Sequence, residues 1–170
     1  MLLDARRHHL SLCLQLYVYV ADRGKEQLYL EDHKERSSKT NTKINQETAR
    51  RIQRLKQIIP SIDTTEIWNC HYVAYLLQHS DNSDDYKLAH EYAKKAIEMG
   101  SNVTKWLYAA TLNRYLLSQG KKQKYGTQFI KKGDVWEMAP FDNSITDAER
   151  AKYFVPPISD ALKVFTEKYK

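Results

Sequence analysis

Cysteine is scarce in this chain, and its two cysteines, Cys13 and Cys70, lie far apart in the sequence. Such a pair is typical of reduced thiols in an intracellular protein and does not indicate a disulfide framework. Four well-known signatures are also missing: a glycine-rich phosphate loop, a Cys-x-x-Cys pair, a His-Glu-x-x-His helix and a Gly-x-Ser-x-Gly turn. Their absence argues against the familiar nucleotide, zinc and serine-hydrolase mechanisms, and no motif predicts a metal or a cofactor.

The chain also lacks an apolar run of the about 20 residues that spanning a membrane requires. Residues 10–21 are apolar and follow a basic stretch, as in a secretory signal peptide. However, Gln15 interrupts the run, and Tyr19 is poorly suited to position minus three of a cut after Ala21. We therefore predict a soluble, cytoplasmic protein with no membrane partner. Residues 10–21 are expected to be buried, and their pattern fits a strand as well as a helix.

Charge of one sign does not dominate any large part of the sequence. The 27 basic and 21 acidic residues give a net charge of +6, and they alternate in segments such as 31–36. This pattern predicts a solvated surface, so we do not expect nucleic acid as a partner. A denser basic stretch, residues 50–56, places Ile52 and Leu55 on one helical face and its charges on the other, as in an ordinary amphipathic helix.

Glycine and proline mark where the predicted helices end. Asn45 is expected to cap a helix that Pro60 stops, and Gly100 and Gly120 close two later helices. The chain fits one domain, residues 1–170, and we predict a mainly α fold: a compact antiparallel helical bundle with a loop-rich C-terminal third. Helices are expected over 25–36, 45–59, 66–79, 86–99, from 102 or 104 to 119, and over 158–169, whereas the structure of residues 1–25 is left open.

Arg114 is the most unusual polar residue in a predicted helix, because it follows the apolar register of Leu107. An arginine in such a stripe either extends its charged end to solvent or pairs with an anion. Its planar guanidinium suits a carboxylate or a phosphate, which could be internal or could belong to a ligand. The candidate internal partners are Asp32, Asp81 and Asp147.

Other polar side chains gather at the end of helix 66–79 and in the loop after Gly120. Gln78 and His79 close the helix, where they could act on a ligand or simply satisfy terminal carbonyl groups. The segment 123–128, Gln-Lys-Tyr-Gly-Thr-Gln, combines amide, phenol and hydroxyl groups with a glycine that lets a ligand or another backbone approach closely. A polar loop placed directly after a helix indicates a site more than a spacer.

These motifs resemble a widespread, mostly bacterial family that is classified as a domain of unknown function. The family is marked by a Gln-His-x-Asp helix end, here Gln78-His79-Ser80-Asp81, and by a Tyr-Gly-Thr-Gln loop, here Tyr125-Gly126-Thr127-Gln128. The resemblance covers residues 26–160, most firmly 70–130. It implies that both motifs belong to one site, but it implies no established reaction.

Three weaker elements of the same family also have counterparts. An acidic-x-x-x-Arg element is similar to the stretch from Asp32 to Arg36, and an arginine near a proline corresponds to Arg150 before Pro156. The Asp-Arg pair of the family is Asn113-Arg114 here, so the arginine is kept and the acid is not. A Gly-Trp-Pro-like turn of the family is replaced by Pro60-Ser61-Ile62-Asp63.

The leading hypothesis is a polar pocket that binds a small polar or anionic ligand, with Arg114 holding the negative charge. If the pocket is catalytic, His79 is the general acid or base and Tyr125 a second proton donor in a hydrolysis or an elimination. Ligand contacts are then expected from Gln78, Asp81, Arg114, Gln123, Gly126, Thr127 and Gln128 and, through the resemblance, from Asp32, Arg36 and Arg150. The alternative is a non-catalytic helical protein-interaction module in which the same residues form a structural network.

Overall fold

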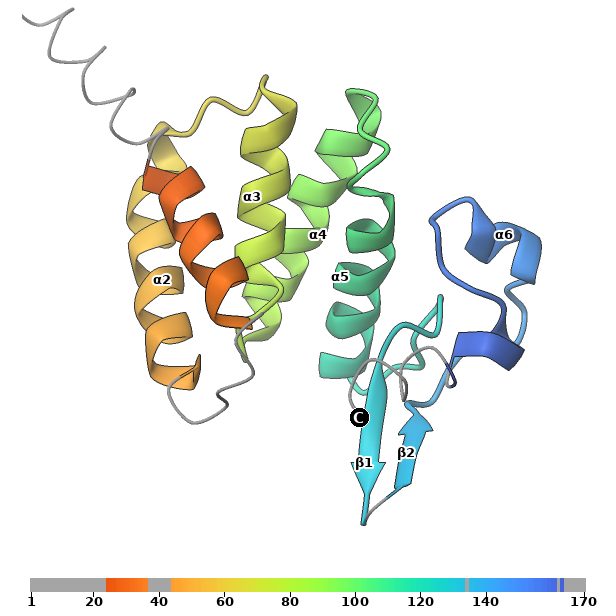
Figure 1. Cartoon of the computed structure of the whole chain (residues 1–170). Coiled ribbons are helices and arrows are strands. Elements are labelled where there is room, and N and C mark those ends of the chain that lie inside the picture. The colour runs from red at the N-terminus through yellow and green to blue at the C-terminus, as the bar shows by residue number, and fades with distance from the viewer. Residues whose placement is uncertain (1–23, 37–43, 134, 162, 164–170) are drawn as a thin grey trace, which may run out of the picture.

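The computed structural model describes residues 24–36, 44–133, 135–161 and 163, which form the mainly helical fold that the sequence predicts (Figure 1). Helix 24–36 is followed by α2 (Ile44–Ile58), the 3-10 turn η1 (Ile59–Ser61), α3 (Ile67–Leu77), α4 (Ser83–Glu98) and α5 (Lys105–Ser118). A hairpin of β1 (Phe129–Lys132) and β2 (Val135–Met138) and the short helix α6 (Asp147–Ala151) come after them. Successive helices from α2 to α5 run antiparallel (Figure 1).

The main core lies between helix 24–36 and the helices α2, α3 and α4. Leu28 packs from helix 24–36 onto a buried cluster made of Ile52, Leu55, Ile58, Ile62, Val73, Leu76, Leu77 and Ala89. Farther along, α3, α4 and α5 meet at Ala74, Ala93 and Leu107, all of them buried. Because alanine is small, these helices can approach closely and hold their ends in fixed relative positions.

Most helix ends follow the local chemistry that the sequence predicts. Helix α2 ends at Ile58, and Pro60 lies in the 3-10 turn that follows it. Gly100 and Gly120 come after α4 and α5 with φ of +99° and +68°, a conformation that glycine adopts without strain. Helices α2 and α4 start earlier than the sequence pattern predicts. Helix α2 begins at Ile44, so Asn45 lies inside it and is not its cap. Helix α4 begins at Ser83, because the Asn82 side chain accepts a hydrogen bond from the backbone N–H of Asp84.

The C-terminal third contains two elements that the sequence pattern did not predict. Strands β1 and β2 pair antiparallel, with Phe129 opposite Met138 and Lys132 opposite Val135. Strand β1 is mostly exposed and β2 is mostly half-buried, so neither shows the alternation that identifies a strand with one buried face. The other element is α6, which begins where the Thr146 hydroxyl accepts a hydrogen bond from the backbone N–H of Glu149.

Some expectations concern residues outside the described part of the chain. These are the structure of residues 10–21, the environment of Cys13, and the end of the predicted helix 158–169, which is seen as helix at 158–161 and 163. Cys70 lies within the described part and is fully buried, which raises the pKa of its thiol. None of the helices built from described residues is both long enough and apolar enough to cross a bilayer.

Candidate functional site

The Asp32 carboxylate is the centre of a buried charged cluster. Asp32 lies on helix 24–36 and is only 1% exposed. One turn later, Arg36 donates to it through Nε at 2.7 Å from Oδ2 and through Nη2 at 3.4 Å from Oδ1. From α2, the Nη2 of Arg51 lies 3.1 Å from Oδ1. Two guanidinium groups from two helices therefore contact a single carboxylate that has almost no access to water.

His79, which follows the end of α3, contacts the same carboxylate. Its Nδ1 lies 3.1 Å from Oδ2 of Asp32, a close contact that does not form a hydrogen bond. The ring of Tyr75, one turn earlier on α3, stands edge-on to the imidazole, with 5.1 Å between the ring centroids and an interplanar angle of 87°. Asp32 and Tyr75 thus hold the imidazole from two sides, and its side chain remains 14% exposed.

The charges of this cluster shift the pKa values of both partners. Burial lowers the pKa of His79; Asp32 acts in the opposite direction, while the charges of Arg36 and Arg114 lower the pKa further. For Asp32, burial raises the pKa, but the interactions with His79 and Arg36 outweigh it and hold the pKa well below its usual range. At neutral pH Asp32 is therefore ionised, and the His79 imidazole is uncharged.

Three arginines act in the cluster around His79. Arg51 also contacts Glu35, at 2.8 Å, and Arg36 donates to the hydroxyl of Thr48 at 3.2 Å. The charge of Arg114 acts on His79 and lowers its pKa. Guanidinium groups are well suited to bind phosphates and carboxylates, because their planar donors match two oxygens of such a group.

The Tyr-Gly-Thr-Gln loop is held by a different set of contacts, centred on two buried amides. Asn113 of α5 accepts from the backbone N–H groups of Lys124 and Tyr125, at 2.9 and 3.0 Å, and donates to the hydroxyl of Thr127 at 2.8 Å. Gln123 donates to the carbonyls of Gln128 and Ala139, each at 2.9 Å, and accepts from the N–H of Gln128 at 3.0 Å. Both amides are fully buried and mostly serve the backbone.

Arg150 belongs to the same loop network and not to the cluster around His79. It is 1% exposed and donates to the carbonyl of Pro156 through Nε, at 3.0 Å, and Nη2, at 2.7 Å, while its Nη1 donates to the carbonyl of Tyr125. Gly126 has a φ of +65°, and a Cβ there would lie 2.6 Å from Nη1 of Arg150 and 3.0 Å from Sδ of Met138. The glycine is therefore required for the arginine to reach the loop.

Tyr125 points into a third environment, on the side of α5 that faces the C-terminal segment. Its ring is 1% exposed and packs with Ala109 and Val155. The ring of Tyr153 lies 4.9 Å away between centroids, and the two side chains are hydrogen bonded. Burial is the main reason why the pKa of Tyr125 lies far above its ordinary value. The contacts described for Tyr125 thus join it to Tyr153, and none of them joins it to His79.

The other predicted site residues lie between or outside these groups. Gln78 is buried at the end of α3, where its backbone N–H donates to the carbonyl of Ala74, whereas Asp81 is exposed on the following turn. Thr127 and Gln128 are hydrogen bonded to each other, and Thr127 reaches the asparagine that precedes Arg114 on α5. The structure therefore gathers Asp32, Arg36 and His79 with Arg114 near them, and it gathers Gln123, Gly126 and Arg150 elsewhere.

Arg51 is a member of the cluster that the sequence reasoning missed. The amphipathic pattern of residues 50–56 predicts that all their charges face solvent, which is wrong for Arg51, since it is only 5% exposed. A signal was present: Thr48, Arg51 and Leu55 are spaced by three and four residues, so they lie on one face of α2, the buried one. Arg51 tolerates this position because Asp32 and Glu35 pair with it.

Comparison of the chain with protein-family models, with curated proteins and with solved structures gave no match. The resemblance to a family of unknown function therefore stays a prediction from the motifs. The assignment of a function depends on the geometry of the two polar groups.

Proposed function

We propose that the chain binds a small anion beside Arg36 and Arg114 and that His79, oriented by Asp32, is its general acid and base. The observation that carries this proposal is the contact of the buried Asp32 carboxylate with His79 and with two arginines. The guanidinium groups of Arg36 and Arg114 would supply the attraction for a phosphate or a carboxylate. The side chain of Arg36 is 28% exposed, so a ligand can reach it from solvent.

Proton transfer at His79 follows from the same contacts. The Nδ1 atom faces Asp32, so the proton of the neutral imidazole belongs on Nδ1 and the basic lone pair on Nε2. Because burial lowers its pKa, the imidazole is uncharged at neutral pH and can accept a proton. The ionised Asp32 then stabilises the imidazolium that forms, and the arginines hold the anionic group of the substrate. This inventory suits a hydrolysis or an elimination on an anionic substrate.

Inorganic phosphate titrated into the folded protein tests the binding part of this proposal. We expect the NMR signals of His79 to shift, and we expect Arg36→Gln to weaken the binding about tenfold, as removal of a charged contact does. Arg50→Gln is the matched control, because Arg50 lies on α2 with 72% of its side chain exposed. Absence of phosphate and acetate binding at millimolar concentrations, or equal losses in the two variants, would contradict the proposal.

The chemical part is tested by His79→Gln. We expect this variant to bind phosphate within a few-fold of the wild type, because the arginines remain. Its phosphate binding should, however, lose the dependence on pH that comes from protonation of His79, which favours a bound anion as the pH falls. An unchanged pH profile in His79→Gln would show that the imidazole does not take part.

A second candidate is the non-catalytic helical interaction module. It is favoured by the loop network, in which Asn113, Gln123 and Arg150 bind mostly backbone groups and so fix the loop as structure. Under this alternative no small anion stabilises the fold, and a partner protein binds an outer surface. The interleaved charges continue to argue against nucleic acid, and the small number of cysteines supports our assignment to the cytoplasm.

A further inference from the structure

A row of aromatic side chains leads along α3 to His79. The row consists of Trp68, Tyr72 and Tyr75 on α3 and Tyr29 on helix 24–36. Trp68 stacks on Tyr72 with 5.9 Å between ring centroids, and Tyr29 lies 4.7 Å from Tyr72 and 4.7 Å from Tyr75. Tyr75 then contacts the imidazole of His79 edge-on. The rings thus form a continuous path that ends at the charged cluster.

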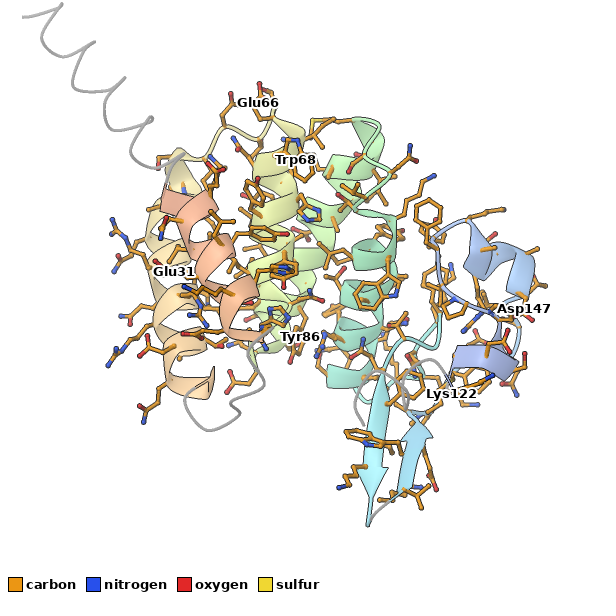
Figure 2. All side chains as sticks on the ribbon, in the orientation of Figure 1. Glu31, Glu66, Trp68, Tyr86, Lys122 and Asp147 are labelled. Atoms are coloured by element: carbon orange, nitrogen blue, oxygen red, sulfur yellow. The ribbon has the colours of Figure 1, made fainter. Side chains whose placement is uncertain are left out.

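This row lies at the margin of the core, where Tyr75 also packs against the buried cluster of Ala74, Ala93 and Leu107. Trp68 is 53% exposed, and the three tyrosines are each partly exposed. Figure 2 shows the side chains of helix 24–36 and α3 turned toward one another, with Trp68 labelled at the start of α3. Apolar rings that are gathered at a surface and left partly in water are typical of places that contact another molecule.

The length of the row matches an extended small molecule. At about 1.5 Å per residue, Tyr72 lies about 10 Å from His79 along α3, and Trp68 about 16 Å. A ligand anchored at the arginines would therefore pass Tyr75 first, then Tyr29 and Tyr72. Its flat faces would meet the faces and edges of these rings, which attract one another in offset and edge-on arrangements.

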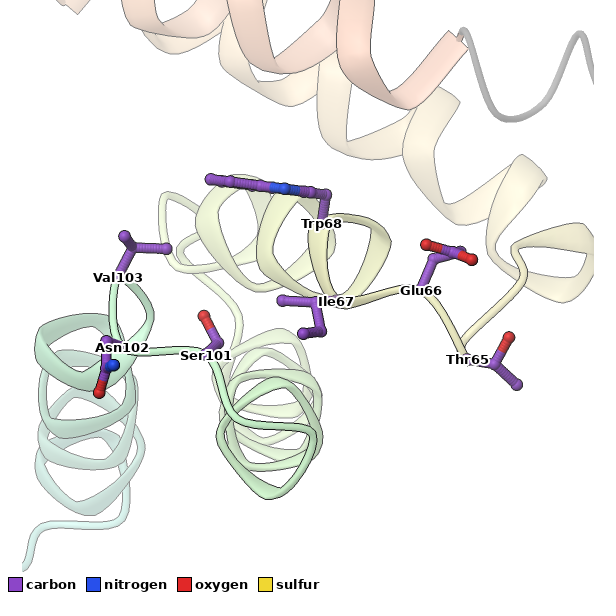
Figure 3. Close-up of a pocket in the computed structure, with 7 residues that line it drawn as sticks. All are labelled: Thr65, Glu66, Ile67, Trp68, Ser101, Asn102 and Val103. Atoms are coloured by element: carbon purple, nitrogen blue, oxygen red, sulfur yellow. The ribbon is translucent and has the colours of Figure 1, made fainter.

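The far end of the row borders a hollow of about 440 Å³ (Figure 3). Residues 65–68, at the start of α3, and 101–103, before α5, line it. In Figure 3 the Trp68 ring extends from α3 toward Val103, with Ile67 on the inner side. The hollow leaves room at Trp68 for the end of a long ligand, so the row is open at this end and cationic at the other.

We propose that the aromatic row binds the flat aromatic body of a ligand whose phosphate or carboxylate lies at the arginines beside His79. This inference rests on the proposed function and narrows it: the substrate class is an anion that carries an aryl group or a base, and not a bare inorganic anion. The arginine cluster selects the charge, and the row selects the planar part.

Two matched pairs of probes test this inference on the full chain by calorimetry. Ribose 5-phosphate and adenosine 5′-monophosphate share the phosphate and the sugar but differ in the base; acetate and 3-phenylpropionate make the same comparison for carboxylates. We expect the aromatic member of at least one pair to bind at least about five- to tenfold more tightly, which is the size of one or two stacking contacts. The pair in which the aromatic member binds more tightly shows whether the anionic group of the ligand is a phosphate or a carboxylate.

Variants of the row should abolish the gain in affinity that the aromatic group brings, while binding of the small anion is kept. Tyr72→Leu and Trp68→Leu should lower the affinity for the aromatic probe about three- to tenfold and leave that of its small partner unchanged. Trp106→Leu is the matched control, since Trp106 is 44% exposed in the first turn of α5 and makes no ring contact with the row among the described residues. In a chain that keeps only Trp68, through Trp106→Phe and Trp136→Phe, the aromatic probe should also change the tryptophan fluorescence.

The outcomes separate this inference from the proposed function. Equal affinity for both members of each pair overturns the aromatic row as a binding surface and leaves the anion site standing. If the aromatic probe still binds more tightly than its small partner in both Tyr72→Leu and Trp68→Leu, the aromatic row is also overturned as a binding surface, because the planar group then binds elsewhere. If no probe binds at all, the inference and the proposed function fail together.

Discussion

The two polar groups of this molecule both have buried centres but are built in opposite ways. Around Asp32, ionisable side chains contact one another: Arg36, Arg51 and His79 share a single carboxylate. Around the Tyr-Gly-Thr-Gln loop, side chains such as Gln123 contact backbone groups almost exclusively. The loop network fulfils the hydrogen-bonding capacity of its members with backbone groups, whereas the cluster places several charged groups beside an uncharged histidine.

This contrast shows that burial of polar residues does not by itself identify a functional site. A side chain that binds several backbone groups is fixed by the fold and fixes the fold in return. A side chain that shares an ionised partner with others changes its proton affinity, which is what acid–base chemistry uses. On this ground we assign the chemistry to the cluster and the support of its surroundings to the loop network.

The largest effect is expected from Arg150→Met. This change removes three charge-assisted donors and leaves the carbonyls of Pro156 and Tyr125 without them, so we expect a loss of about 4 kcal/mol of unfolding free energy. Urea denaturation measures the loss. The phosphate affinity of the molecules that remain folded should not change. A loss of affinity would mean that Arg150 belongs to the anion site, and the distinction between the cluster and the loop network would then be wrong.

Asp32→Asn should cost about 3 kcal/mol, because Arg36 and Arg51 lose the charge that compensates them in a buried place. The pKa of His79 should fall further, since Asp32 is the group that raises it. Denaturation and NMR titration give the two values. Glu35→Gln is the control: Glu35 contacts Arg51 but is 38% exposed, so its loss should cost less than about 1 kcal/mol.

Gly126→Ala tests how tightly the loop is held. We expect a loss of about 2 kcal/mol, which combines the strain of a positive φ with the overlap of the new Cβ with Arg150. Gly133, in the hairpin turn, has a φ of +60° but has nothing within 4 Å of such a Cβ. Gly133→Ala should therefore show the cost of the strain alone. Equal losses of unfolding free energy at the two glycines would mean that the Arg150 side chain moves away from the new Cβ at little cost.

The pH dependence of stability should come from the buried histidines. Burial lowers the pKa values of His71, His79 and His90 below the 6.5 of a free histidine. The unfolded chain therefore binds protons first, and stability should fall as the pH drops below 6.5, by about 1 kcal/mol between pH 7 and pH 6. Asp32 adds nothing in this range, because its contribution is lost only when the pH falls through its lowered pKa. Urea midpoints at each pH test this, and a flat profile would contradict it.

The smallest effect is expected from Arg50→Ala. Arg50 contacts Glu47 at 2.9 Å, but both side chains are well exposed, so the pair should contribute less than about 0.5 kcal/mol. Arg50 is next to Arg51 in the sequence and differs from it in facing water. A large loss of unfolding free energy in Arg50→Ala would contradict the assignment of Arg50 to the exposed face of α2 and Arg51 to the buried face.

The helices could be predicted from local sequence because their signals are local. Pro60, Gly100 and Gly120 end helices through their own backbone preferences, whatever surrounds them. The hairpin shows no alternation of buried and exposed residues, and α6 has only five residues, too few to display a helical period. Their existence followed only from the structure.

The site could be predicted only in part. The motifs pointed to His79 and Asp32, which do meet, but spacing alone could not tell that Tyr125 turns toward Tyr153. An amphipathic pattern likewise classified Arg51 as exposed, because the carboxylates that make its burial tolerable come from another helix. Side-chain direction and pairing between elements are properties of the assembled fold, and a single sequence does not display them.

The reach of Arg150 back to the carbonyl of Tyr125 also sets an order of events during biosynthesis. The loop at 123–128 leaves the ribosome before the arginine that clamps it, and before Pro156, whose carbonyl anchors that arginine. The nascent bundle can therefore pair its helices while this loop is still unclamped. A stop codon placed between positions 128 and 150 would release a chain that contains the residues of helices α2 to α5 and the loop but lacks the arginine that clamps the loop.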